Sequence, residues 1–339
     1  MDISVFGQPE ISPVLDSEKL RLQYCEAEKR LLVFDYDGTL TPLVKNPEEA
    51  TLSTQALHSI TTLSADPRNS VWIVSGRDQK FLHEQVGHIP ELGLSAEHGC
   101  FIRKPHSDSW ESLIGQTDLT WQTEVTKVFQ RFTARTKGSF TERKRVAVTW
   151  HYPQADPEEG AHLAQECLNL LEETVVGKRS VVVMPGKANL EVRPTCVNKG
   201  SVVTRLVDEN LIAPGRQYGY ILCAGDDHTD EDMFRALQRD VPTERICTIT
   251  VGPTSKRSAA KWSIPNPAET LFLDLPPRIR HLLWQRQQKS ATANAFFKRR
   301  HIAHDMRDIQ EYPGPKVNTK EMALGLTTPL PTTVPGSTM

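Results

Sequence analysis

The segment LLVFDYDGT, residues 31–39, constrains the fold more than any other part of this 339-residue sequence. Its apolar half predicts a buried strand, and Asp35 and Asp37 follow at the point where that strand should end. Side chains two residues apart on a strand leave the same face, so both carboxylates can reach one small polar molecule. Like charges this close are costly to bury unless a cation lies between them. The pattern therefore predicts a divalent metal, although an acidic turn would give the same short motif.

Three later segments also place polar residues directly after apolar runs. The residues concerned are Ser75, Gly76 and Arg77 after SVWIV, Lys199 in VNKG, and Gly225, Asp226, Asp227 and Asp230 around the end of GYILCA. The carboxyl ends of parallel strands form one edge of an open sheet, and ligands bind at that edge. We therefore expect all four segments to share one pocket.

The alternation of apolar runs predicts strands and helices in turn. Expected elements are a strand at 31–36, a helix at 53–64, a strand at 71–74, a helix at 81–86 and a short strand in GLSAEHG. This βαβαβ order predicts an α/β fold with a doubly wound parallel sheet, as in Rossmann-like hydrolase cores. A further buried strand, GYILCAG, should be followed by a helix at 230–237.

The middle of the chain has a different pattern. It predicts helices at 121–135 and 158–174, a long strand at 140–152, and strands at 179–184 and 188–193. We expect an α+β cap domain, residues 106–193, inserted into a discontinuous core domain of residues 1–105 and 194–290. Residues 291–339 end in a stretch rich in Thr and Pro, so we expect a disordered tail.

The order of the motifs D-x-D-G-T, Ser, Lys and G-D-D-x-x-D resembles that of the haloacid dehalogenase superfamily of phosphotransferases. The segments GLSAEHG, GSFTERKRVAVTWHY, GKANLEVRP and AGDDHTDEDMF resemble trehalose-6-phosphate phosphatases, especially fungal ones, and the similarity covers about residues 25–285. The resemblance implies a Mg²⁺-dependent phosphatase of trehalose biosynthesis. Its product would be trehalose, released through an aspartyl-phosphate intermediate.

Physical chemistry gives the matched residues their roles. Asp35 would attack phosphorus, which divides one difficult displacement into two easier steps. Asp37 would protonate the departing sugar oxygen and then take a proton from water. Ser75, Lys199 and the cation would balance the charge that develops on the phosphoryl oxygens.

The resemblance also implies how the metal is held. Its ligands would be Asp35, the backbone carbonyl of Asp37, and Asp226, with Asp230 orienting them. Arg77 could be a second phosphate contact or could form a surface ion pair.

Substrate choice would lie in the cap. Lys187, Asn189 and Glu191 share one face if they lie on one strand, although an ordinary solvent-facing strand has the same pattern. The resemblance matches these residues to the motif that binds glucose hydroxyls, and adds Glu97, His98, Glu142, Lys144 and His151. On an unbroken strand 140–152, however, His151 faces the opposite side from Glu142 and Lys144, so a bulge would be needed.

Composition excludes some classes of function. The formal net charge of -2 gives no sign of general nucleic-acid or membrane affinity. No long apolar run is present and MDISVFGQPE lacks the pattern of a signal peptide, so we expect a soluble cytoplasmic protein. Six cysteines show no metal-ligand spacing and are interpreted mainly as small core residues.

Two alternatives to trehalose 6-phosphate hydrolysis stay open. The core motifs do not encode the sugar, so the substrate could be another sugar phosphate, such as sucrose 6-phosphate or glucosyl-glycerol phosphate. The chain could also be a non-catalytic subunit that binds and regulates a trehalose-phosphate synthase. Nucleic-acid binding, which rests on basic patches such as KRR, ranks last.

Overall fold

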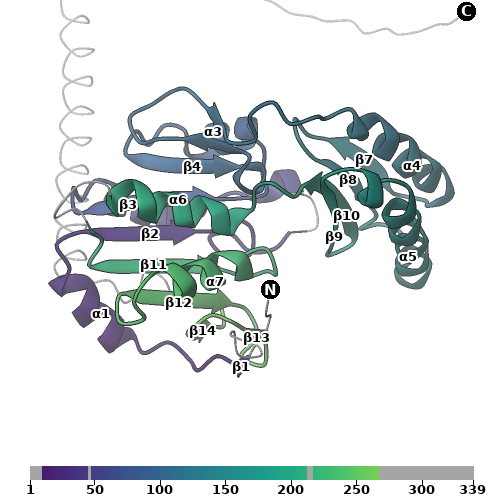
Figure 1. Ribbon diagram of the computed structural model, residues 1–339. Helices are drawn as coiled ribbons and strands as arrows, with labels where there is room; N and C mark the ends of the chain where they lie inside the picture. The colour runs from purple at the N-terminus through teal and green to yellow at the C-terminus, as the bar shows by residue number, and fades with distance from the viewer. Residues whose placement is uncertain (1–9, 45–46, 212–216, 267–339) are drawn as a thin grey trace, which may run out of the picture. The chain divides into compact units, whose positions relative to one another are not determined.

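The strand that precedes Asp35 lies in the middle of a mostly parallel sheet (Figure 1). This computed structural model describes residues 10–44, 47–211 and 217–266. All of them lie within one compact unit, Met1–Arg280. The core and cap boundaries that we expected therefore stay a prediction, and the expected disordered tail lies outside the described residues.

The described residues contain helices and strands close to the expected positions. The helices are α1 Ser17–Glu26, α2 Thr54–Ser64, α3 Gln79–Val86, α4 Trp121–Arg135, α5 Pro157–Thr174, α6 Lys199–Leu211 and α7 Glu231–Asp240. The strands are β1 Glu10–Ile11, β2 Arg30–Phe34, β3 Asn69–Val74, β4 Leu92–Ala96, β5 Phe101–Arg103, β6 Glu111–Ser112, β7 Phe140–Arg143, β8 Val148–His151, β9 Val181–Gly186, β10 Asn189–Pro194, β11 Tyr220–Gly225, β12 Ile246–Val251, β13 Arg257–Ser258 and β14 Trp262–Ile264.

Within the described ranges, eight strands form the large sheet, in the order β14-β12-β11-β2-β3-β4-β5-β6. The strands from β14 to β4 pair in parallel, whereas β5 pairs antiparallel with both β4 and β6. After β2, the next strands in the sequence, β3 and β4, are added on one side of it. After β11, the next strand, β12, is added on the opposite side. This reversal places a topological switch point between β2 and β11, where ligands bind in sheets of this type. The expected doubly wound fold is confirmed.

Both faces of the large sheet are covered, because the side chains of each strand alternate between them. On β2, Leu32 and Phe34 pack in one apolar cluster and Leu31 and Val33 in another. The first cluster includes Ile60 and Leu63 of α2 with Leu82 and Val86 of α3, and the second includes Val203 and Leu206 of α6 with Phe234 and Leu237 of α7. Burial of each such side chain contributes about 1.5–3 kcal/mol. The central strand is thus fixed from both sides.

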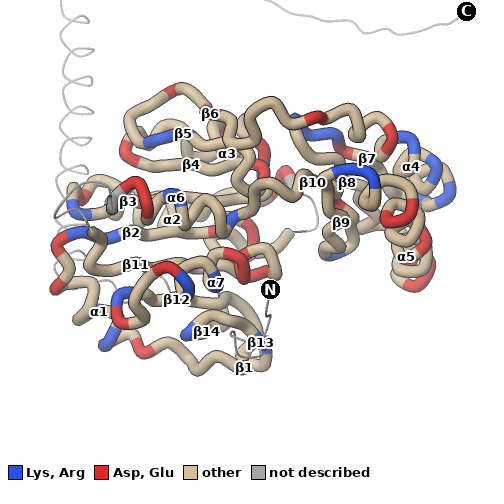
Figure 2. Tube along the Cα trace, in the orientation of Figure 1, with Lys and Arg blue, Asp and Glu red and all other residues tan. Residues whose placement is uncertain are grey.

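The inserted segment forms a second, antiparallel sheet, the small sheet, with the order β7-β8-β10-β9. One face packs on α4 and α5 through Phe129, Trp150 and Leu190, which are almost fully buried. Charged residues on α4 are mostly basic and those on α5 are acidic (Figure 2), and Arg135 lies 3.0 Å from Glu166. The other face of the small sheet is left for polar residues.

The expected single strand at 140–152 is wrong, because this segment is the hairpin β7–β8. The turn at 144–147 is closed by a hydrogen bond from Lys144 N to Ala147 O at 2.9 Å. Phe140 lies opposite His151 and Glu142 opposite Thr149, so these four side chains share one face. No bulge is needed. The turn contains neither Gly nor Pro, and the charged run ERKR was the only sign of it.

Lys187 also differs from expectation. It lies with Ala188 in the turn between β9 and β10, rather than on a strand. Ala188 has a φ of 58°, a left-handed conformation that is unusual for a residue other than glycine. Asn189 and Glu191 do share a face, as expected, whereas Lys187 lies outside the strand pairing.

Both edges of the large sheet are closed or short. At one edge β6 has two residues, one of them the charged Glu111. At the other edge, the segment before α1 pairs with β14, where Leu15 N donates to Ser263 O at 3.0 Å and Ser263 N donates to Pro13 O at 2.8 Å. Among the described residues, neither edge of the large sheet presents a long unpaired strand.

The pairing of β3 with β4 predicts the effect of substituting Gly93 on β4. Gly93 lies directly opposite Trp72, and a Cβ at Gly93 would lie 2.3 Å from Cδ2 of the Trp72 ring. We expect Gly93→Ala to lower the free energy of unfolding by about 1–3 kcal/mol through overpacking. Gly177→Ala is the control, because its nearest neighbour would be 3.9 Å away. Its effect should stay within about 0.5 kcal/mol. Urea denaturation measures both, and equal effects would contradict the prediction.

Candidate active site

Backbone pairing brings the polar segments together at the switch point. Asp35 follows β2, and its N–H donates to the carbonyl of Ala224 on β11 at 3.0 Å. Asp226 follows the last residue of β11, and Ser75 follows the last residue of β3. Lys199 begins α6 after the chain has returned from the small sheet. The segments therefore meet at the carboxyl edge of the large sheet, as the sequence predicted.

Lys199 is the buried cation of this site. Its Nζ lies 2.7 Å from Asp35 Oδ1 and 2.8 Å from Asp230 Oδ1. The three side chains are almost fully buried. Burial alone would lower the pKa of Lys199, but Asp230 and Asp35 outweigh it and raise that pKa well above its usual range. Lys199 is therefore charged at neutral pH.

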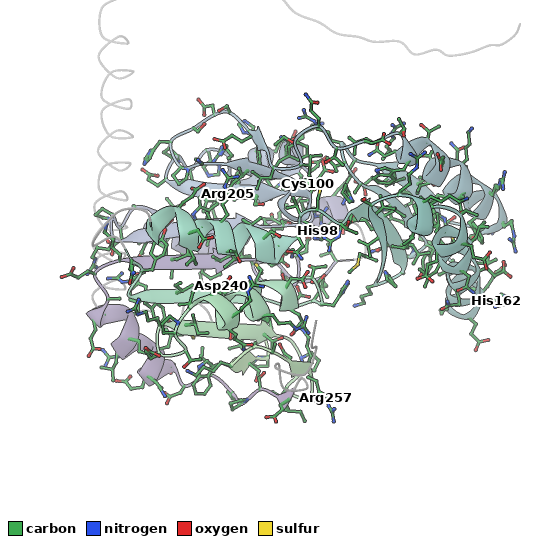
Figure 3. The ribbon with its side chains drawn as sticks, viewed as in Figure 1. His98, Cys100, His162, Arg205, Asp240 and Arg257 are labelled. Carbon is green, nitrogen blue, oxygen red and sulfur yellow. The ribbon has the colours of Figure 1, made fainter. Side chains whose placement is uncertain are left out.

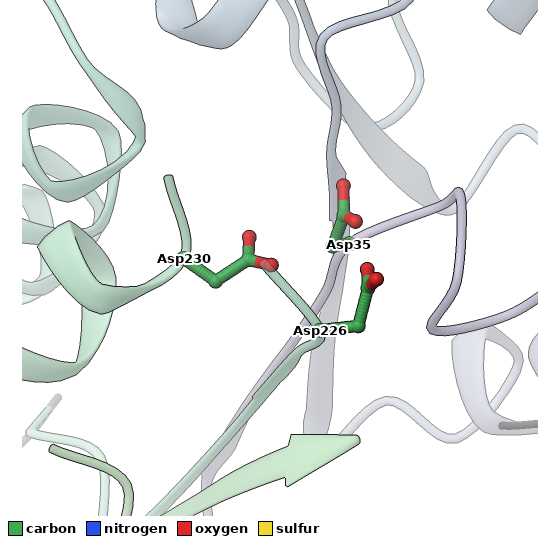
Figure 4. A group of neighbouring side chains, drawn as sticks. All are labelled: Asp35, Asp226 and Asp230. Atoms are coloured by element: carbon green, nitrogen blue, oxygen red, sulfur yellow. The ribbon is translucent and has the colours of Figure 1, made fainter. Parts of the chain in front are cut away.

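Three aspartates surround a common point near Lys199 (Figure 4). One carboxylate oxygen from each of Asp35, Asp226 and Asp230 lies within 4.8 Å of the others. Burial, together with Asp230 and Asp227, raises the pKa of Asp226 to about 7. Burial also raises the pKa of Asp35, despite Lys199. The cluster is short of positive charge, and its oxygen atoms are the ligands that a hard divalent cation prefers. The residues present fit such an ion.

Asp226 is held by groups from two other segments. Thr39 Oγ1 donates to Asp226 Oδ1 at 3.4 Å, and Lys256 Nζ donates to the Asp226 carbonyl. Gly38 has a φ of +79°, and a Cβ there would lie 2.2 Å from Asp226 Oδ2. Glycine is therefore required both by the turn and by the approach of this carboxylate.

Asp37 lies at the rim and is paired with Arg77. The guanidinium donates from Nε to Oδ2 at 2.7 Å and from Nη2 to Oδ1 at 2.6 Å, a two-point contact that fixes both oxygens. Arg77 in turn lies over the ring of Phe81, 4.3 Å from its centroid. Ser75 is buried beneath this pair, and its Oγ accepts a hydrogen bond from Arg77 N at 3.1 Å.

On the polar face of the small sheet, Glu191 is the centre of a buried network. Lys144 Nζ and Thr149 Oγ1 each donate to Glu191 Oε2 at 3.1 Å, and His98 Nε2 lies 3.2 Å from Oε1. Burial opposes ionisation, but Lys144 and His98 outweigh it and hold the pKa of Glu191 well below its usual range. Burial lowers the pKa of His98 to about 4. His98 is therefore neutral at pH 7 and donates from Nε2.

The network spans the large and small sheets. His98, marked in Figure 3, follows β4 of the large sheet, whereas Glu191 belongs to β10. Lys144 Nζ also donates to the carbonyl of Gly76 at 3.1 Å. Further out on the same face, His151 Nε2 lies 2.8 Å from Glu142 Oε2, and the His151 ring stacks on Phe140 with centroids 4.7 Å apart.

Two adjoining cavities connect these groups. The inner cavity, of about 480 Å³, is lined among others by Asp35, Lys187, Asn189, Glu191, Lys199 and Asp226. The outer cavity, of about 700 Å³, is lined among others by Arg77, Phe81, Phe140 and Glu142. Both are lined by Asp37, Gly76, His98, Lys144 and His151. The predicted site residues that line neither cavity are Ser75, Glu97 and Asp230.

Some residues at the inner cavity were not predicted from the sequence. Thr149 donates to Glu191, and His228 and Thr229 follow the acidic pair after β11. Arg193 is 5% exposed and lines the cavity, and its Nε and Nη1 have no hydrogen-bond partner among the described residues. Arg193 lies two residues beyond Glu191 on the same strand, so strand periodicity was a signal for it.

Comparisons with known proteins agree with this arrangement. The family model described as trehalose-phosphatase matches residues 33–268. A second model, for a domain of unknown function, matches residues 278–327, outside the described residues. A trehalose-phosphatase of Schizosaccharomyces pombe is 49% identical over 261 residues, which is 76% of this chain and 32% of that protein. A trehalose-phosphatase of Saccharomyces cerevisiae is 41% identical, over 77% of this chain and 32% of that protein. The chain thus spans about a third of the length of these relatives.

Solved structures are similar as well. A trehalose-6-phosphate phosphatase of Aspergillus fumigatus matches with a TM-score of 0.60 and 56% identity, over 81% of this chain and 99% of that one. The C-terminal domain of a trehalose-6-phosphate phosphatase of C. albicans matches with a TM-score of 0.74 and 40% identity, over 78% of this chain and 96% of that one.

The raised pKa of Asp226 predicts how stability depends on pH when metal is removed. The folded protein keeps a proton on Asp226 up to about pH 7, whereas the unfolded chain releases it near pH 3.9. Because the folded state binds more protons in this range, the Asp226 contribution to stability falls as the pH rises through it. With a chelator present, we expect Asp226→Asn to flatten the decrease in melting temperature between about pH 5 and pH 8.

Thermal denaturation of the wild type and of Asp226→Asn over this range gives the slope of melting temperature against pH for each protein. In the difference between the two slopes, the contributions of other titrating groups cancel. Added divalent cation should stabilise the wild type more at the higher pH, because metal and proton compete for the same carboxylate. Parallel pH profiles for the wild type and Asp226→Asn would contradict the assignment.

Proposed function

The chain belongs to the trehalose-phosphatase family, and we propose on that basis that it hydrolyses trehalose 6-phosphate to trehalose and inorganic phosphate. The observation that carries the proposal is the arrangement of Asp35 beside Lys199 and Asp226, in a cavity whose far side is the polar face of the small sheet. A nucleophile, a phosphate-binding cation and a set of sugar-binding groups thus surround one space.

Asp35 is the nucleophile in this mechanism. Its carboxylate attacks phosphorus, the bond from phosphorus to the sugar oxygen breaks, and an aspartyl-phosphate forms. Lys199 balances the charge of the phosphoryl group, and Ser75, which follows the end of β3, would donate a hydrogen bond to a phosphoryl oxygen. Burial of Asp35 and Lys199 excludes water, which strengthens these interactions.

Asp37 moves the proton in both steps. It donates a proton to the departing sugar oxygen, and then accepts one from the water that hydrolyses the aspartyl-phosphate. Asp37 borders both cavities, so it can reach a leaving group that extends from one into the other. The two-point contact with Arg77 orients both oxygens of Asp37, and one of these hydrogen bonds has to open for Asp37 to carry the proton that it donates.

The cofactor that we propose is Mg²⁺. Its ligands would be Asp35, Asp226 and the backbone carbonyl of Asp37. Asp230 accepts hydrogen bonds from Lys199 Nζ and from the N–H of Asp227, and would orient these ligands. When bound, the ion supplies positive charge to the phosphoryl oxygens. The excess of carboxylate charge at this point supports the assignment.

Substrate choice is assigned to the cap domain that we propose, residues 106–193. Glu142, Lys144, His151, Lys187, Asn189 and Glu191 all line the inner or the outer cavity. Carboxylate, amide and ammonium groups suit sugar hydroxyls, which both donate and accept hydrogen bonds. His98 joins them from the core side. Two adjoining cavities suit a disaccharide better than a single sugar ring.

The alternatives are less well supported. A phosphatase for sucrose 6-phosphate or glucosyl-glycerol phosphate would need the same core residues, so only the sugar-binding face separates these substrates. A non-catalytic regulatory subunit would not need Asp35, Asp37, Lys199 and Asp226 in one cavity. Association with a trehalose-phosphate synthase stays part of the proposal, since a relative of Dictyostelium discoideum with 37% identity is named as such a synthase.

Location in the cytoplasm also stays a prediction. No helix in the described part of the chain has the length and apolar character needed to cross a membrane.

Phosphate release from a panel of sugar phosphates tests the function. With Mg²⁺, we expect trehalose 6-phosphate to be hydrolysed faster than sucrose 6-phosphate, glucosyl-glycerol phosphate or glucose 6-phosphate. Asp35→Asn should lower kcat by about 10⁴-fold or more, since it removes the nucleophile. Asp37→Asn should lower kcat by roughly 10²- to 10⁴-fold.

A matched control is Asp208→Asn, which changes an exposed aspartate on α6 and should leave the rate unchanged. A malachite-green assay measures all of these rates. Full activity of Asp35→Asn, or preference for another sugar phosphate, would reject the proposed mechanism or substrate.

A further inference from the structure

Glu97 was expected at the sugar, but the structure places it behind the cavities. Its side chain is 2% exposed and lines neither cavity. Its Oε2 accepts hydrogen bonds from the backbone N–H of Val146 at 2.8 Å and of Ala147 at 3.2 Å. A carboxylate from the large-sheet side therefore binds the turn that joins β7 to β8 of the small sheet.

We propose that Glu97 is a positioning residue that fixes the turn 144–147 at the rim of the site, so that Lys144 is placed to bind the sugar. This inference rests on the function proposed above. It concerns the backbone of the turn, whereas the sugar contacts are made by other residues.

The turn connects Glu97 directly to the site. Lys144 lies two residues before Val146, and its N–H closes the turn by donating to Ala147 O at 2.9 Å. From this backbone, Lys144 Nζ reaches the carbonyl of Gly76 and Glu191 Oε2, both at 3.1 Å. A shift of the turn would therefore move Lys144 relative to Asp37 and to the centre of the polar network.

The backbone at Glu97, which presents the carboxylate to the turn 144–147, has an uncommon conformation. Glu97 and His98 have φ values of 47° and 55°, and neither is glycine. Such conformations persist where the surroundings fix them, and they are frequent at functional sites. Here the hydrogen bonds from Glu97 N to Arg77 O and from His98 N to Ser75 O, each 2.9 Å, tie the segment to the residues after β3. One short segment thus presents Glu97 to the turn and His98 to Glu191.

Only one of the two Glu97 oxygens is used. Oε1 is buried and has no hydrogen-bond partner among the residues that the structure describes. The contact therefore needs an acceptor oxygen at one place, and glutamine can supply it. Methionine has a similar length but no acceptor, so it would leave two buried N–H groups without partners.

The test compares Glu97→Gln with Glu97→Met in the full chain. We expect Glu97→Met to raise KM for trehalose 6-phosphate by roughly 10- to 100-fold, as expected for a small displacement of a positioning group, with a much smaller change in kcat. Glu97→Gln should stay close to the wild type. Amide hydrogen exchange, which needs no activity, should become faster at Val146 and Ala147 in Glu97→Met alone.

Arg145→Ala is the matched control. Arg145 lies in the same turn and contacts the large-sheet side through Gln79 at 3.3 Å and through the ring of Phe101, 4.8 Å from its centroid, but only by an exposed side chain. We expect its KM and its amide exchange to match the wild type. Circular dichroism checks folding, and Glu97→Ala replaces Glu97→Met if that variant does not fold.

Three results would overturn the inference: unchanged exchange at the two amides in Glu97→Met, a Glu97→Gln variant as impaired as Glu97→Met, or a loss of kcat at constant KM. If the wild type releases no phosphate from trehalose 6-phosphate, the proposed function fails instead, and the exchange data still decide whether Glu97 holds the turn.

Discussion

The ion pairs of Lys199 with Asp35 and Asp230 are the interactions on which the rest of the site depends. An ammonium group and two carboxylates are removed from water here, which is favourable only when each charge has a partner at close range. These residues lie just after β2, at the start of α6 and just before α7, which are far apart in the sequence. Their pairing therefore requires the strand order of the large sheet. The remaining carboxylate, Asp226, forms no ion pair among the described residues, since Lys256 contacts only its backbone carbonyl, and this imbalance favours a metal ion.

A second charged network joins the large sheet to the small sheet. Glu191 is buried and Lys144 is partly buried, and each is ionised because the other is present. His98 contributes a neutral hydrogen-bond donor rather than a charge, since burial lowers its pKa to about 4. The polar face of the small sheet is thus organised before any sugar binds. Preorganised polar groups lose less freedom on binding than mobile ones do, which favours selectivity for one arrangement of hydroxyl groups.

The sequence predicted the parts of the fold that depend on local periodicity. Helices such as α4 and α5, and strands such as β2 and β11, follow from apolar spacing, and the pocket followed from the rule that parallel strands share a carboxyl edge. The hairpin at 140–152 was missed because its turn has charged residues instead of Gly or Pro, so the two β-rich halves seemed continuous. Contacts such as Glu97 with the turn could not be predicted, since they join residues about 50 positions apart and depend on tertiary packing.

The closed edges of the large sheet bear on how the molecule behaves at high concentration. An open edge strand offers unpaired backbone groups to which a strand from another chain can add, and this is a common route to aggregation. Here the pairing of Pro13 and Leu15 with Ser263 occupies one edge, and the short, charged β6 ends the other. Strand addition at the described edges is thereby disfavoured. In the described part of the chain, the large sheet can therefore keep its parallel, strongly apolar centre without offering an open edge strand to a second molecule.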